Sequence, residues 1–464
     1  MKRFALALAG IFCLLQTGLA QAQSGISDTR EFELTPIAPP SPALKYELLF
    51  DPQDRRPGNA ALLYFQAEAL MGQEYAQKIA DAEDAYQAKD DAKFTALAAK
   101  LDYPSVQAIL DLAGRCDFYD REAPLHERGS FAMLPYLNTS RVIADWLEVR
   151  AIAQVRTGQV ADAIGTLRLG LELGRKVGSE PVLVSGLVGC GIIAVMSSNP
   201  MTELMNRPDA PNLYWALASL PRPLMSFQRA LTMERIYVVA DLPELADPHL
   251  DDFSGQQWRD IFDKAVSIVG GNSPAAPAND GAFANPQVVA EEVNHTLPRA
   301  SEYYAQSHHL SADQVQQLDP FQVVAAYWYH EYQVVSDDYY KLTAFPYPLA
   351  ITKMNEAADR LKKLEAEEPA NVFLFFHASL NRAAVTFGRV DRMLAALTAV
   401  EAIRSYAAAN GGKLPQTLDA ITDTPVLDNP GTGKPFDYSV QGDRAILSDQ
   451  SLGLPLKYTI RIRK

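Results

Sequence analysis

Cysteine is scarce in this chain, and basic residues are outnumbered by acidic ones. Three cysteines in 464 residues are too few for a disulfide scaffold. Only Cys116 and Cys190 lie beyond the first 22 residues, and the sequence leaves open whether they pair. The 42 lysines and arginines face 56 aspartates and glutamates, so the chain repels phosphate backbones and anionic lipid surfaces. We therefore expect no nucleic-acid partner.

Long hydrophobic runs are also few. The apolar run at positions 4–15 follows two basic residues and precedes Ala20-Gln21-Ala22, which is typical of a secretory signal peptide over residues 1–22. A second uncharged run, residues 182–198, is short and rich in glycine and serine, so we expect it to be buried in a helical core. These patterns predict an exported protein, periplasmic or extracellular, with no integral membrane segment after signal cleavage.

Complete motifs for catalysis or nucleotide binding are missing as well. A Gly-x-Gly-x-x-Ala pattern occurs at 189–194, but helical segments precede it and Pro200 follows closely, which favours packing by small residues. The segment GTGK at 431–434 lacks the flanking glycine and hydroxyl of a phosphate loop, which favours a turn. His330-Glu331 lacks the second histidine of a zinc-protease helix. No Gly-x-Ser-x-Gly or Ser-x-x-Lys pattern occurs.

Helical spacing dominates what is present. The apolar positions Leu62, Phe65, Ala69, Ile79 and Ala82 recur at helical intervals in the first predicted helix. The unit at 144–177 contains two helices that join at a glycine turn, and it resembles a tetratricopeptide repeat, a hairpin in which small residues let two helices pack closely. After residue 425, short alternating segments predict two or three antiparallel strands.

The predicted fold is therefore mainly α, with tetratricopeptide-like, α-solenoid-like helical hairpins and a small C-terminal α+β cap that contains a short antiparallel sheet. Composition shifts divide the chain further. The predicted order is a signal peptide (1–22), a proline-rich extended arm (23–58), a helical hairpin domain (59–241), an acidic and then Pro/Gly-rich linker or excursion (242–298), a helical region (299–390), and a C-terminal helix with a small β cap (391–464).

A tyrosine-rich helix is predicted over residues 321–342. Its aromatic rings, with Glu331, Asp337 and Asp338 nearby, either line a groove for a saccharide or peptide or pack between helices, and the spacing favours packing. The groove supports an alternative function, a hydrolase of cell-envelope glycan or peptide that uses Glu331 with one of the two aspartates as acid and base.

Four segments carry further landmarks: 43–67, 115–137, 144–177 and 210–224, among them "RCDFYDREAPLHERGSFAMLPYL" at 115–137. Together they resemble a large uncharacterised family of exported bacterial helical proteins. The resemblance implies a helical secreted protein. It implies no known activity and therefore carries over no catalytic residue.

The C-terminal segment places "NGGKLPQTLDAI" after a helix and "DNPGTGKPFDY" shortly beyond it. This succession resembles the globular head of type II secretion pseudopilins, without their N-terminal helix. One class of such heads holds calcium through loop oxygens, so the resemblance makes Asp428, Asp443 and Asp449 calcium candidates. Aspartates are also ordinary turn residues. Apart from this calcium hypothesis, the sequence predicts no cofactor and no metal ligands.

The functional expectation follows from the missing motifs and the predicted architecture. Stacked helical hairpins present broad surfaces, and no catalytic motif is complete. We expect an exported, non-catalytic scaffold or protein-interaction protein whose partner is a protein. The sequence leaves the specific role and the oligomeric state open.

Overall fold

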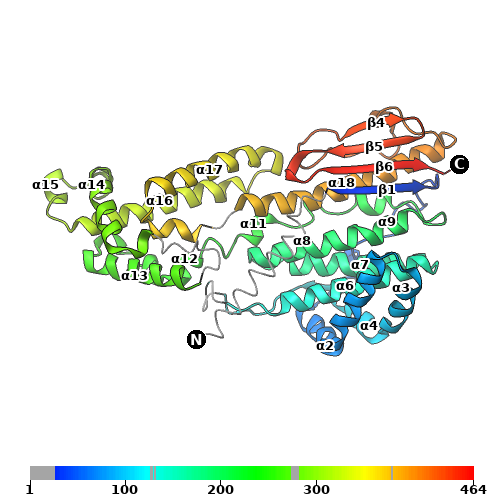
Figure 1. Cartoon of the computed structure of the whole chain (residues 1–464), viewed down its shortest axis with the longest axis horizontal. Helices are drawn as coiled ribbons and strands as arrows, with labels where there is room; N and C mark the ends of the chain where they lie inside the picture. The colour runs from blue at the N-terminus through cyan, green and yellow to red at the C-terminus, as the bar shows by residue number, and fades with distance from the viewer. Residues whose placement is uncertain (1–26, 126–128, 130–131, 273–281, 378–379, 464) are drawn as a thin grey trace. The chain divides into compact units, whose positions relative to one another are not determined.

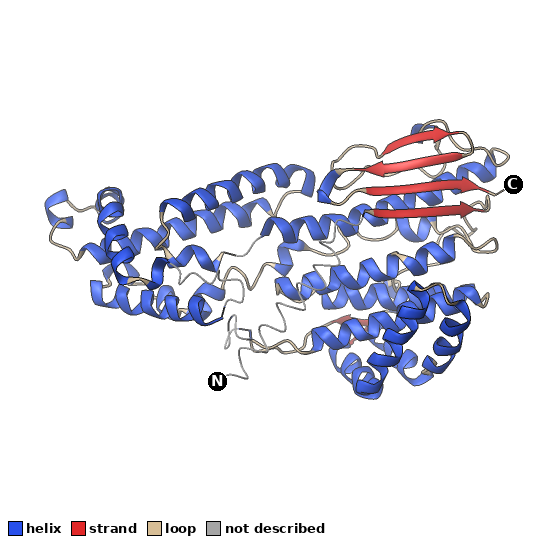
Figure 2. Cartoon of the chain, in the orientation of Figure 1, coloured by secondary structure: helices blue, strands red, loops and turns tan. Residues whose placement is uncertain are grey.

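The computed structural model describes residues 27–125, 129, 132–272, 282–377 and 380–463. They form two compact units, and each is described by itself. The main unit comprises Gly25–Ala123, Met133–Ala230 and Ala383–Lys464, and the middle unit is built on Leu231–Arg382 with Pro124–Ala132. The structure is 64% helical, which confirms the mainly α fold (Figure 2). The predicted signal peptide lies outside the described residues.

Helices form most of the main unit (Figure 1). Its helices are α2 (Ala60–Gln87), α3 (Asp91–Ala98), α4 (Pro104–Arg115), α6 (Tyr136–Arg156), α7 (Val160–Val177), α8 (Leu183–Ser197), α9 (Asn199–Met205), α10 (Tyr214–Ala218), α11 (Phe227–Ala230) and most of α18 (Leu380–Ala409). The predicted hairpin is α6 and α7, which turn at Gly158 with a positive φ of 81°. Trp146 on α6 and Leu167 on α7 are 0% exposed. The hairpin is present, but the structure does not confirm a tetratricopeptide-like repeat.

One apolar stretch among the described residues, Leu183–Met205, is long and apolar enough by composition to cross a membrane. It comprises α8 and α9. Val188, Cys190 and Ile193 on α8 are at most 2% exposed within the main unit. Since a buried core helix passes the same test of length and composition, this stretch is only a weak indication of a membrane span.

A four-stranded sheet completes the main unit, in the order β1-β6-β5-β4. The antiparallel strands β4 (Asp437–Gln441), β5 (Arg444–Asp449) and β6 (Leu456–Ile462) confirm the small C-terminal sheet. The fourth strand, β1 (Asp28–Leu34), pairs in parallel with β6 along its whole length. A separate pair is formed by β2 (Arg56–Asn59) and β3 (Cys116–Phe118).

Strand β1 corrects the prediction of an extended arm over residues 23–58. Its sequence, DTREFEL, alternates so that Phe32 and Leu34 are 0% exposed while Glu31 and Glu33 face solvent. A strand with one buried face and a complete register with β6 belongs to the sheet. The start of the predicted arm therefore forms the fourth strand of the sheet in the C-terminal cap.

Helix α18 carries charged residues that are buried in the main unit. Arg404 is 0% exposed and donates to the carbonyl oxygens of Thr35 at 2.8 Å and Ala210 at 2.7 Å, with Glu401 also in reach at 3.4 Å. Buried charges need such partners. These contacts tie the segment after β1 and the loop before α10 to α18.

The middle unit corrects the predicted linker over residues 242–298. Two long helices, α13 (Gly255–Asn272) and α14 (Pro286–His308), occupy most of that range, and residues 273–281 lie outside the described part. Trp258 and Phe262 on α13 pack into a core with Trp328 and Phe373. The other helices of this unit are α12 (Tyr237–Asp241), α15 (Ala312–Val315), α16 (Pro320–Leu342) and α17 (Tyr347–Glu367).

Short 3-10 helices connect these elements. They are η1 (Pro52–Asp54), η2 (Ala99–Leu101), η4 (Pro243–Ala246), η5 (Leu250–Asp252), η6 (Ala282–Ala284), η7 (Val372–Phe376), η8 (Leu418–Ala420) and η9 (Ser451–Gly453). Helix α18 runs without a break across the predicted boundary between residues 390 and 391. That boundary therefore falls inside a helix and not between two regions.

Candidate functional site

The carboxylates predicted on the tyrosine-rich helix do not converge. Glu331 lies two helical turns from Asp338 along α16, and the Asp337 side chain is 75% exposed. Asp338 forms ion pairs with Lys341 at 2.5 Å and Arg360 at 2.8 Å, and the hydrogen bond from Lys341 is the main cause that lowers its pKa. A carboxyl that two cations hold ionised is a poor general acid. The structure therefore does not assemble the predicted acid–base pair.

The aromatic residues of α16 belong to the core of the middle unit. Trp328, Tyr329, Tyr332 and Tyr339 are at most 6% exposed. The Phe262 ring stacks on Trp328 with 5.9 Å between centroids. These rings are packed between helices, as the spacing predicted.

Sequence reasoning missed a second carboxyl near Glu331. Glu368 accepts a hydrogen bond from Arg299 Nη2 at 2.6 Å on one oxygen and from Asn371 Nδ2 at 3.0 Å on the other. Burial is the main cause that raises the pKa of Glu368 to about 7, and the charge of Glu331 adds to the rise. The Glu368 side chain is 0% exposed, and both of its oxygens are occupied. Its contacts therefore tie α14 to the segment after α17.

The three calcium candidates are not brought together. Asp443 is 79% exposed in the turn before β5, and Asp449 is the last residue of β5, about 20 Å away at the usual rise of a strand. Asp449 accepts a hydrogen bond from Arg392 Nη1 at 2.7 Å, and Asp428 is exposed. Among the described residues, no group of three or more His, Cys, Asp or Glu side chains is placed to hold a metal ion.

Both cysteines that the sequence left open are free thiols in the core. Burial raises the pKa of the Cys190 thiol well above its usual value. Its neighbour Gly189 explains the Gly-x-Gly-x-x-Ala pattern, because a Cβ at this position would lie 2.5 Å from the carbonyl oxygen of Gly174 and 2.7 Å from Cα of Gly178. The pattern marks a close approach of α7 and α8, as small-residue packing predicted.

The first half of α2 exposes an unusual apolar surface. Helix α2 is broken at Gly72, where φ is 55° and ψ is 174°. Before this break, Leu62, Phe65 and Leu70 are 66%, 63% and 52% exposed, although Tyr64 on the opposite side is 1% exposed. We call Leu62, Phe65, Ala69 and Leu70 the outward face of α2.

Charge does not interrupt this outward face. Within residues 60–71 the one charged side chain is Glu68, which pairs with Arg121 at 2.6 Å, and both side chains are under 10% exposed. A surface helix of a globular protein usually turns its polar side chains to solvent and its apolar side chains to the core, so large apolar residues on the exposed side are unusual. Here one face of α2 is buried within the main unit, and Leu62, Phe65 and Leu70 are exposed.

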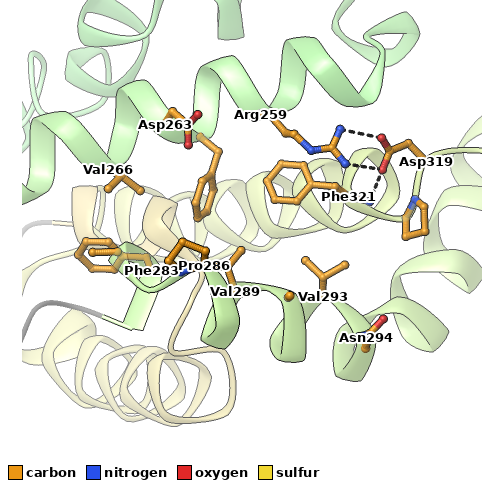
Figure 3. A pocket seen from close by; sticks show the side chains of 14 residues that line it. Arg259, Asp263, Val266, Phe283, Pro286, Val289, Val293, Asn294, Asp319 and Phe321 are labelled. Carbon is orange, nitrogen blue, oxygen red and sulfur yellow. Dashed lines mark hydrogen bonds and ion pairs between the residues drawn. The ribbon is translucent and has the colours of Figure 1, made fainter.

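A pocket of about 510 Å³ lies in the middle unit between α13, α14 and the start of α16 (Figure 3). Two of the helices that line this pocket begin with the same kind of sequence, a capping residue followed by a proline. Asn285-Pro286 starts α14 and Asp319-Pro320 starts α16, each with a side-chain cap and a proline in the first turn. The apolar lining comes from Phe262, Val266, Phe283, Val289, Val293 and Phe321.

Polar groups stand at the edge of this pocket. Arg259 donates to both carboxylate oxygens of Asp319, at 2.7 Å and 2.9 Å, and its guanidinium lies 5.0 Å from the Phe321 ring centroid. The hydrogen bond from Arg259 is the main cause that lowers the pKa of Asp319. Asp263 also lines the pocket and is exposed. The hydrogen bond to Asp319 is the main cause that raises the pKa of Arg259, and the negative charge of Asp263 adds to the rise. None of these residues was predicted from the sequence.

No protein-family model, curated protein or solved structure matches the chain. The resemblances to an exported helical family and to pseudopilin heads therefore stay predictions.

Proposed function

We propose that the chain is an exported, non-catalytic protein-interaction protein and that the outward face of α2 is its contact surface. The observation that carries this proposal is the exposure of Leu62 and Phe65, each above 60%, on a face without a charged side chain. Clusters of exposed large apolar residues are typical of interaction sites. The partner surface is accordingly apolar.

The possible gain in binding free energy is substantial. Burying a leucine or phenylalanine side chain fully contributes about 1.5–3 kcal/mol. Leu62 and Phe65 together would offset part of the lost translational and rotational freedom of two proteins that associate. A negative charge at either position would have to be desolvated in the complex, which makes charge reversal of the surface a sensitive test.

The test compares three forms of the full protein as bait in cross-linked extracts of the cell envelope. The forms are the wild type, the double variant Leu62→Glu/Phe65→Glu, and Leu349→Glu on α17, where the native side chain is 65% exposed and apolar as well. We expect a species that the wild type and Leu349→Glu both capture and the double variant does not. Equal capture by all three forms would remove the outward face of α2 from the proposal, and no reproducible species with any form would contradict the interaction role itself.

The alternative is a glycan or peptide hydrolase that uses Glu331. The nearness of a second carboxyl, Glu368, to Glu331 favours it, and burial, the main cause, raises the pKa of Glu368 to about 7, a range in which enzymes often use an acid. Against it, Glu368 has no exposed side-chain surface. Hydrolysis of envelope polymers that disappears in both Glu331→Gln and Glu368→Gln would support the alternative, and full retention would remove it.

A further inference from the structure

The pocket between α13 and α14 differs chemically from the outward face of α2. Its lining combines three aromatic rings and several aliphatic side chains with the polar residues Arg259, Asp263, Asn294 and Asp319, and its volume of about 510 Å³ lies in the range of small-molecule sites. Arg259 and Asp319 neutralise one another through two hydrogen bonds. Asp263 adds a further carboxylate at the edge, so the lining carries a net negative charge.

We infer that this pocket binds a small organic amine in which an apolar ring or branched chain is joined to a cationic nitrogen. The apolar body contacts Val289 and Val293, whose side chains point into the space in Figure 3, and Phe283, which also lines the pocket. The cationic nitrogen lies at the edge beside Asp263. This inference concerns the middle unit and does not depend on the proposed contact surface of the main unit.

Charge complementarity selects the amine over other ligands of the same shape. A carboxylate ligand would need a free cation, but the Arg259 guanidinium is already held by Asp319 at 2.7 Å and 2.9 Å. A neutral ligand would gain the apolar contacts alone. An ammonium group gains an exposed ion pair in addition, which strengthens binding modestly and weakens as salt is added.

The experiment uses three probes with one indole body: tryptamine, tryptophol and indole-3-acetate. Binding to the full protein is measured by ligand-observed saturation-transfer NMR and by isothermal titration at low and high salt. We expect tryptamine to bind about fivefold more tightly than tryptophol at low salt, and indole-3-acetate to bind more weakly than both. Equal affinities, an inverted order, or no binding of tryptamine at millimolar concentration would overturn the inference.

Three variants locate the site. Asp263→Asn should abolish the preference for tryptamine over tryptophol and leave tryptophol binding unchanged. The matched control is Asp260→Asn, because Asp260 is an exposed aspartate on the same helix that does not line the pocket, and it should keep the preference. Val289→Phe should weaken all three probes by filling the apolar space.

Unchanged thermal unfolding of each variant shows that the fold is intact. A preference that survives Asp263→Asn, or tryptamine binding that survives Val289→Phe, would place the probe elsewhere and overturn the inference. If a variant fails to fold, the salt dependence and the order of the three probes on the wild-type protein still decide the question.

Discussion

Two glycines in α8 should respond in opposite ways to the same substitution. Gly189 and Gly191 are two residues apart, and both belong to the Gly-x-Gly-x-x-Ala pattern. A Cβ at Gly189 would lie 2.5 Å from the carbonyl oxygen of Gly174, whereas a Cβ at Gly191 has no atom within 4 Å. If the pattern exists for packing of α7 against α8, then only the first position is intolerant of a methyl group.

The magnitudes follow from these distances. Replacing an exposed helical glycine by alanine stabilises a helix by about 0.5–1 kcal/mol, so Gly191→Ala should raise the free energy of unfolding by about that amount. At Gly189 the obstructing atoms are backbone atoms of α7 and cannot rotate away, so the two helices must separate. Such overpacking typically costs about 1–3 kcal/mol and outweighs the gain in helix propensity.

The assay must report on the main unit alone, because a chain with two compact units need not unfold in one transition. Hydrogen exchange of the amides of α7, followed by mass spectrometry, gives the local free energy of opening. Gly189→Ala should lower protection in α7, and Gly191→Ala should keep or raise it. Equal protection in the two variants would refute the packing explanation of the pattern.

Three further outcomes are expected. Asp449→Asn should lower the local stability of β5 by about 3 kcal/mol, because it leaves the buried Arg392 guanidinium without its counter-charge. The control Asp443→Asn, at an exposed turn, should change this stability by less than about 0.5 kcal/mol. Equal effects of the two substitutions would contradict the role of the buried pair. Millimolar calcium should not raise the unfolding temperature of the wild-type protein, and an increase that EDTA reverses would show a calcium site that the described residues do not form. Burial raises the pKa of Glu148 to about 7 and the pKa of Asp145 to about 6. The folded main unit therefore retains protons that the unfolded chain releases. Its free energy of unfolding should fall as the pH rises from about 5 to about 7. Glu148→Gln should flatten this fall in thermal unfolding, and an unchanged slope would contradict the assignment.

The sequence was sufficient for features that depend on neighbouring residues. Helical spacing predicted the hairpin of α6 and α7 and the packing of the α16 aromatics, and alternation predicted two or three antiparallel strands at the C-terminus, of which the structure has three. The small residues at 189–194 predicted close helix packing. These signals are local, because backbone periodicity and side-chain size act within one or two elements.

Composition was misleading for a segment that forms long helices and for a strand whose partner is distant in sequence. The acidic and Pro/Gly-rich range 242–298 was predicted as a linker, yet most of it forms α13 and the start of α14 around Trp258. The arm over 23–58 supplies β1, whose partner β6 lies more than 400 residues away in sequence. Pairing over such a separation leaves no signal in either segment alone.

Which apolar residues are exposed could not be predicted from the sequence, because it depends on the tertiary structure. Leu62, Phe65, Ile79 and Ala82 share one helical stripe in the sequence, but the structure exposes the first two and buries the last two. The reason is the non-helical backbone at Gly72, which changes the phase of the helix between them. The sequence by itself determined the composition, the local periodicity and most of the helices of this protein. Only the tertiary structure determined which apolar helix face is exposed to solvent and which carboxylates form ion pairs, because both depend on contacts between segments that are far apart in the chain.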